Sequence, residues 1–147
     1  MRLSTRGRYG VTAMYDLAMH YGAGCVPLKS IAERQNLSET YLEQLISPLR
    51  KSGLVRSTRG AQGGYVLARE PKAITVGDVI RILEGPIAPV DCVIEKDGNG
   101  YCGKTEVCIT RDIWLKLKES MDKVLDSITL EDLCSTESRK NGQEGSI

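Results

Sequence analysis

The sequence has little histidine, no long apolar run and almost no net charge. His20 is the one histidine among 147 residues, and this scarcity excludes most histidine-based catalysis. No apolar run approaches the roughly 18 residues that a membrane-spanning helix needs. The N-terminus has basic residues but no apolar h-region, so we expect no signal peptide, no membrane association and a cytoplasmic protein.

The net charge of +1 hides an uneven distribution along the chain. Up to Val90 there are 12 Lys or Arg and 7 Asp or Glu, a net charge of +5. From Asp91 onward there are 8 and 12, a net charge of −4. A basic front and an acidic back indicate that only the front half binds a polyanion.

The front half is patterned as three helices followed by a hairpin. Apolar spacing and alternation predict helices over about 5–21, 28–36 and 38–51 and strands over 54–57 and 65–68. Ser38 is a favourable N-cap for the third helix, and Pro48 inside that helix predicts a kinked or shortened last turn. A glycine-rich tip carrying Arg59 joins the strands. This order is typical of a winged helix-turn-helix domain.

The back half contains a long amphipathic segment. Apolar residues from Ile113 to Ile128 are spaced by 4, 4, 3 and 4 residues, which predicts a helix from about 110 to 126. A small winged domain cannot bury this stripe alone, so we interpret the helix as a dimerisation helix; an ordinary core helix is the alternative. The expected organisation is a DNA-binding domain over 1–85, a cysteine-containing loop over 86–109, the dimerisation helix with a short terminal helix over 110–134, and a disordered tail over 135–147.

The third predicted helix has an apolar face for docking and a polar face that suits a DNA groove. Gln44 can pair with adenine, and Glu43 can accept a hydrogen bond from cytosine N4. Arg59 at the thin tip can enter a minor groove. Phosphate contacts are expected from Thr40, Tyr41, Arg50 and Lys51. Each feature alone fits a solvated face or a simple turn; the order of the elements and the charge together favour DNA binding.

Three of the five cysteines lie close together in the sequence. Cys92, Cys102 and Cys108 are separated by nine and five residues, within a glycine-containing stretch that can close on one metal centre. Thiolates select iron–sulfur clusters, zinc or Cu(I), and the paired C-x₂-C of common zinc modules is absent. A zinc site, three buried free thiols and a redox pair are the alternative interpretations of these cysteines. Cys25 and Cys134 are expected to pack as small apolar residues.

Several motifs resemble one family of bacterial winged-helix transcription regulators, the Rrf-two family that includes IscR, NsrR and CymR. The motifs are LSTRGRYG at 3–10, S-x-x-YLEQL at 38–45, GLV at 53–55, RG-x-x-GGY at 59–65 and L-x-x-L at 130–133. The resemblance implies homodimers that bind palindromic double-stranded DNA. It places Thr40, Gln44 and Arg59 at the DNA and links Glu43 to the choice between operator types. Tyr9 and Ser38 lie within the motifs and complete the predicted DNA-binding residues.

The resemblance is nearest in type to IscR, and it implies an iron–sulfur cluster on Cys92, Cys102 and Cys108. A 2Fe–2S cluster is favoured over 4Fe–4S. Arg111 stands where IscR has a histidine ligand, so the fourth ligand is left open.

The predicted function is therefore a cluster-sensing transcriptional repressor, with cluster-assembly proteins as further partners. The alternatives are a CymR-like regulator of cysteine metabolism without a cluster and a zinc-stabilised interaction module. An enzyme is disfavoured because there is no C-x-x-C and no base near a candidate nucleophile.

Overall fold

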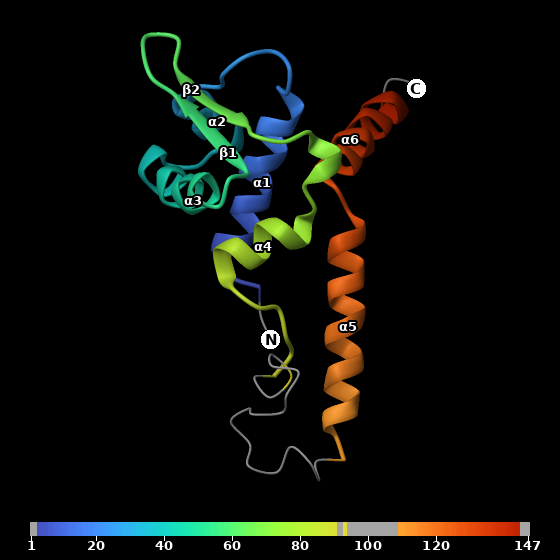
Figure 1. The fold of residues 1–147 in the computed structure, drawn as a ribbon. Coiled ribbons are helices and arrows are strands. Elements are labelled where there is room, and N and C mark those ends of the chain that lie inside the picture. Colours follow the sequence, from blue (N-terminus) through green and yellow to red (C-terminus); the bar gives the residue numbers. More distant parts are fainter. Residues whose placement is uncertain (1–2, 91–92, 94–108, 145–147) are drawn as a thin grey trace.

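A computed structural model describes residues 3–90, 93 and 109–144, the last six of them as backbone only. The elements are α1 (Thr5–Met19), α2 (Leu28–Gln35), α3 (Glu39–Lys51), β1 (Val55–Thr58), β2 (Gly64–Leu67), the 3-10 helix η1 (Pro71–Ala73), α4 (Val76–Glu84), α5 (Arg111–Ser127) and α6 (Leu130–Glu144). The expected mainly helical winged helix-turn-helix fold with a small hairpin is confirmed (Figure 1).

The reading head, by which we mean α1 to β2 together with α4, is built around α1. Met14 and Leu17 of α1 pack against the apolar face of α3, which is fully buried. That face is the one predicted from its spacing: Leu42, Leu45, Ile46 and Leu49. One expectation needs correction, because Tyr21 lies beyond α1 and is 44% exposed. Helix α3 reaches Lys51 as its spacing predicts, so Pro48 does not shorten it; the Pro48 carbonyl still accepts a hydrogen bond from the amide of Ser52.

The hairpin is extended by a third segment. β1 and β2 are antiparallel, with Val55 opposite Leu67 and Thr58 opposite Gly64. Val26 pairs with Tyr65 through two backbone hydrogen bonds of 2.8 Å. A side chain at Gly64 would collide with the Val26 carbonyl, so glycine is needed for this approach. The segment that precedes α2 thus fixes the wing to the helical core.

Helix α4 is the part of the reading head that contacts α5. A Cβ at Gly10 would overlap the Leu83 side chain, so this glycine lets α4 lie directly on α1. Figure 1 shows α5 as a long helix that stands to one side of the head. Within the described part of the chain, α4 is the element with which α5 packs extensively. No described helix is long and apolar enough to cross a membrane.

Helix α6 is longer than expected. The capping box at Thr129 and Asp132 is present, with hydrogen bonds of 2.9 and 3.1 Å, as its spacing predicts. However, the helix continues to Glu144, so the expectation of a disordered tail needs correction from Ser135 to that residue. Leu133 and Cys134 pack against the core, and this contact with α1 supports a helix whose further residues are polar.

Candidate nucleic-acid interface

The recognition helix α3 presents its polar side chains outward. The Ser38 hydroxyl accepts a hydrogen bond from the backbone amide of Tyr41 at 3.1 Å, so the predicted N-cap is confirmed. Leu42 and its buried partners face the core, which forces the intervening positions away from it. Thr40, Glu43 and Gln44 are accordingly exposed. Their side chains are free to meet base edges or phosphates.

An aromatic pair connects α1 to the beginning of α3. The rings of Tyr9 and Tyr41 lie edge to face, with centroids 6.1 Å apart and planes at 87°. Tyr9 is 36% exposed, and Tyr41 is half-buried. The two rings therefore form one aromatic unit at the N-terminal end of α3. Sequence reasoning places both residues at the DNA but gives no sign of the contact between them.

The wing is held beside the other end of α3. The Arg50 guanidinium lies 3.5 Å from the Ser57 hydroxyl of β1, and both residues are exposed. Ser57 is absent from the predicted interface, because the register that places it opposite Tyr65 is known only from the hairpin. Figure 1 shows α3 and the hairpin on the same side of the reading head.

The wing tip needs its glycines. Gly60 has a φ of +115°, a conformation that side-chain-bearing residues rarely adopt. A Cβ at Gly63 would collide with the Thr58 carbonyl. Arg59 is exposed at this tip. A thin glycine tip with one exposed guanidinium has the dimensions and charge that a narrow minor groove accepts.

An ion pair between a buried aspartate and an exposed arginine, which sequence reasoning missed, fixes the first helix of the helix-turn-helix. Asp16 of α1 is 2% exposed, and Arg34 of α2 donates to both of its carboxylate oxygens at 2.8 and 3.0 Å. Gln35 donates to it at 2.9 Å. Burial alone would raise the pKa of Asp16, but the bonds from Arg34 and Gln35 and the charges of Arg34 and His20 hold that pKa below its ordinary value. This network ties α2 to α1.

The two cysteines that lie in the described part of the chain are half-buried and free. Cys134 packs against the core as predicted, and burial raises the pKa of its thiol. Cys25 instead lies beside the wing, where its Sγ donates to the Thr58 hydroxyl at 3.3 Å. Cys92, Cys102 and Cys108 lie outside the described residues.

The structure thus brings the predicted DNA-binding residues to one side of the reading head. Tyr9, Tyr41 and the α3 face share the N-terminal end, and Arg50 joins that helix to the wing that carries Arg59. Their contacts with DNA stay a prediction.

Comparison with known proteins agrees with this geometry. The model of the Rrf2 family, described as iron-dependent transcriptional regulators, matches residues 3–136. The transcriptional regulator CymR of Bacillus subtilis is 53% identical over 92% of this chain and 91% of its own, and its solved structure superposes with a TM-score of 0.76. The transcriptional regulator IscR of Escherichia coli is 43% identical over 93% of this chain and 82% of its own. The structure of T. potens IscR is 51% identical, covers 100% of this chain and 92% of its own, and gives a TM-score of 0.74. These relatives are transcriptional regulators rather than enzymes, and the chain belongs to the Rrf2 family of transcriptional regulators.

Proposed function

We propose that this regulator is a cytoplasmic, iron–sulfur-cluster-binding repressor that binds palindromic DNA as a homodimer and senses cluster status. The observation that carries the proposal is the position in the sequence of Cys92, Cys102 and Cys108. In the sequence, the three cysteines lie between α4, which belongs to the reading head, and α5. A ligand bound by these cysteines can therefore change the position of α5 relative to α4.

The exposed face of α3 and the wing support the DNA part of the proposal. Gln44 and Glu43 supply base-reading groups, and Thr40, Tyr41 and Arg50 supply phosphate contacts. Tyr9 and Ser38 act at the N-terminal end of the helix. Arg59 would occupy the adjacent minor groove. Binding is expected to weaken as salt rises, because cations on this surface displace counterions from the DNA.

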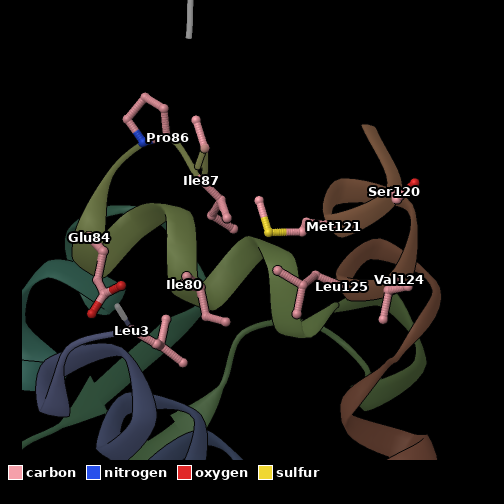
Figure 2. A pocket seen from close by; sticks show the side chains of 10 residues that line it. Leu3, Ile80, Glu84, Pro86, Ile87, Ser120, Met121, Val124 and Leu125 are labelled. Atoms are coloured by element: carbon pink, nitrogen blue, oxygen red, sulfur yellow. The ribbon is translucent and has the colours of Figure 1, made fainter. Parts of the chain in front are cut away.

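An apolar surface on α5 that the described part of the chain leaves exposed supports the homodimer. Ile113, Leu117 and Val124 are 56%, 43% and 56% exposed, although all belong to the predicted stripe. Next to them, a groove of about 570 Å³ opens between α4 and α5. Figure 2 shows Met121 and Leu125 of α5 facing Ile87 and Ile80 across this groove. A contiguous apolar surface of this kind is typical of a subunit interface.

The dimer can be tested by sedimentation of the full chain. Leu117→Lys places a charge within the exposed stripe and is expected to sediment as a monomer at micromolar concentration. Lys116→Ala, one residue away and outside the stripe, is the matched control and should stay dimeric. A dimeric Leu117→Lys variant would remove α5 from the interface.

The donor set fits a cluster in its chemistry. Three thiolates are ligands that iron–sulfur clusters prefer. The resemblance to IscR favours 2Fe–2S over 4Fe–4S. Arg111 follows Cys108 by three residues, and its Nε is buried without a hydrogen-bond partner in the described structure. A guanidinium donor suits the neighbourhood of an anionic group. Arginine remains protonated, so it does not itself ligate iron, and the fourth ligand must come from elsewhere. When bound, the cluster supplies a centre that responds to cluster supply or oxidants.

A CymR-like regulator of cysteine metabolism without a cluster is the second candidate. The 53% identity with Bacillus subtilis CymR favours it. The absorption spectrum of the anaerobically purified protein separates the two. A visible chromophore that is lost in Cys92→Ala, Cys102→Ala or Cys108→Ala supports the cluster. Cys25→Ala and Cys134→Ala are the controls and should keep it. A colourless protein with native DNA binding would favour the CymR-like function, and stoichiometric zinc would favour a zinc-stabilised module.

A further inference from the structure

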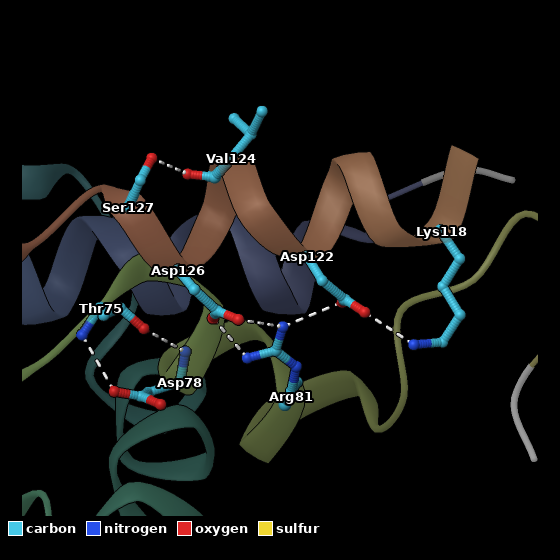
Figure 3. Close-up of polar contacts among 8 residues, drawn as sticks. All are labelled: Thr75, Asp78, Arg81, Lys118, Asp122, Val124, Asp126 and Ser127. Atoms are coloured by element: carbon cyan, nitrogen blue, oxygen red, sulfur yellow. Dashed lines mark hydrogen bonds and ion pairs between the residues drawn. The ribbon is translucent and has the colours of Figure 1, made fainter. Parts of the chain in front are cut away.

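An arginine of α4 binds two carboxylates of α5. One Arg81 nitrogen lies 2.6 Å from a carboxylate oxygen of Asp126, and the other lies 3.0 Å from the second oxygen (Figure 3). This second nitrogen also donates to Asp122 at 2.9 Å. The two carboxylates are four residues apart and share one face of α5. We call Arg81, Asp122 and Asp126 the α4–α5 clamp.

The surroundings are shaped for this clamp. A Cβ at Gly77 would collide with the Asp126 carboxylate, so the glycine gives that side chain room to reach Arg81. The hydrogen bonds that Arg81 donates to Asp126 outweigh burial and, with those to Asp122, raise the pKa of Arg81 above its ordinary value. Two-pronged guanidinium contacts fix direction as well as distance, which lysine cannot do.

The clamp lies at the contact between the reading head and α5. On its C-terminal side, α5 ends in a short backbone pairing, in which Val76 donates to Ile128 at 2.8 Å and Leu130 donates to Ile74 at 3.0 Å. On its N-terminal side, the first half of α5 extends away from the head and leaves Ile113 exposed. On its other side, α4 packs against α1 and α3. The angle between α4 and α5 is therefore the angle between the reading head and the expected dimerisation helix.

Small changes in that angle have large consequences at the DNA. With 17 residues, α5 is about 25 Å long, at 1.5 Å per residue. A rotation of roughly 10° about one end moves the other end by about 4 Å, which exceeds the ~3.4 Å rise of one base pair. A dimer that reads two half-sites requires their separation to match its own geometry.

We propose that Arg81 is a positioning residue that sets the half-site spacing accepted by the dimer. The inference rests on the proposed function, because it requires a dimer through α5 and palindromic DNA. Arg81 acts through Asp122 and Asp126 rather than by touching DNA. Its removal should change which spacing is bound and leave the reading of a single half-site intact.

The test uses operators selected from a random duplex library with the wild-type full chain. The best palindrome is rebuilt with its centre shortened or lengthened by one and two base pairs, and a duplex with one half-site is included. Affinities are measured by fluorescence anisotropy at fixed salt. Arg81→Ala is expected to lower the preference for the best spacing over its neighbours by about threefold to tenfold, as the loss of partly exposed ion pairs allows. Affinity for the single half-site should stay unchanged.

A second variant and a control keep the test sharp. Gly77→Ala displaces the Asp126 carboxylate while it keeps every charge, and it should relax the spacing preference in the same way even if Arg81→Ala fails to fold. Lys118→Ala removes the 2.7 Å bond that Lys118 makes to Asp122 inside α5, so it should leave the preference intact. Arg81→Lys should rescue the preference only in part.

The failures are distinguishable. If the wild-type chain is dimeric and prefers one spacing, but Arg81→Ala and Gly77→Ala show the same preference, the clamp inference is wrong and the proposed function stands. An equal loss for every spacing and for the single half-site would also overturn it, because that result indicates a folding defect alone. If the wild-type chain is monomeric or binds no palindrome, the proposed function and the inference both fail.

Discussion

Glu84 at the end of α4 caps the beginning of α1 through the backbone amide of Gly7. The amide of Gly7 donates to the Glu84 carboxylate at 3.2 Å, and the amide of Ser4 donates to it at 2.8 Å. The Ser4 hydroxyl also contacts this carboxylate. A Cβ at Gly7 would lie 2.8 Å from the Glu84 side chain, so this glycine admits the cap. Glu84, which is 77 positions from Gly7, thus caps α1, because the Ser4 side chain makes no capping hydrogen bond.

Replacing Glu84 should destabilise the reading head. Glu84→Ala leaves amides of the first turn of α1 without their acceptor and is expected to lower the free energy of unfolding by about 1–2 kcal/mol. Glu84→Gln retains an oxygen acceptor and should cost less. Urea unfolding at one fixed protein concentration measures both, because a dimer's apparent stability depends on concentration. Equal stability of the alanine variant and the wild type would mean that water replaces the cap.

The buried Asp16 should make part of the stability depend on acid. Its pKa is lowered in the folded protein, so its contribution is complete above the ordinary pKa of an aspartate, about 3.9. The contribution is lost as the pH falls through the lower, folded pKa. Asp16→Asn removes the charge that Arg34 and Gln35 surround, and at neutral pH it should cost about 1–3 kcal/mol.

The pH profile distinguishes this charge effect from a packing defect. The difference in unfolding free energy between the wild type and Asp16→Asn should shrink as the pH falls from about 5 toward 2. Asp78→Asn is the control for the same change of side chain outside the Asp16 network, since that carboxylate is half-buried in a capping box. If the difference in unfolding free energy between the wild type and Asp16→Asn stays constant with pH, the charge of Asp16 does not stabilise the fold.

Sequence patterns predicted the parts of this fold that depend on near neighbours. The predicted N-cap at Ser38 involves residues three apart and is confirmed, and the structure has the same spacing in its capping boxes at Thr75 and Thr129. The apolar face of α3 follows from its spacing in the same way. The spacing of the apolar stripe also predicted α5, to within one residue at each end.

Long-range contacts could not be predicted from such patterns. Asp16 and Arg34 are 18 residues apart, and Arg81 and Asp126 are 45 apart, so no local pattern pairs them. The length of α6 was missed because its support comes from packing against α1 rather than from its own polar sequence. Sequence motifs identify the candidate DNA-binding residues, but only the folded structure shows that Tyr9 and Tyr41 are in contact.

Arg59 should contribute to DNA affinity through the wing. Arg59→Ala is expected to weaken binding to a palindromic operator by about 1–3 kcal/mol, the usual cost of one specific side-chain contact. Fluorescence anisotropy at fixed salt measures the change. Lys72→Ala is the matched control, because it removes one positive charge from η1, where the side chain pairs with Glu70 at 3.3 Å. Equal affinities for Arg59→Ala and the wild type would exclude the wing from the mechanism.

Glu43 should act by discrimination rather than by affinity. Its carboxylate is exposed on the reading face of α3, where it can accept from cytosine N4 but repels a base edge that offers only acceptors. A carboxylate that loses its hydration without gaining a hydrogen-bond donor lowers the binding affinity, so sites without a donor at this position bind more weakly. Glu43→Ala is therefore expected to bind the best operator nearly as well and poor operators better. Sequencing of the duplexes bound from a randomised operator library measures the ranking. Glu70→Ala makes the same change in net charge at the N-cap of η1. It should leave the ranking as in the wild type, because the Glu70 side chain pairs with Lys72. The same ranking for Glu43→Ala and the wild type would show that this carboxylate does not select the site.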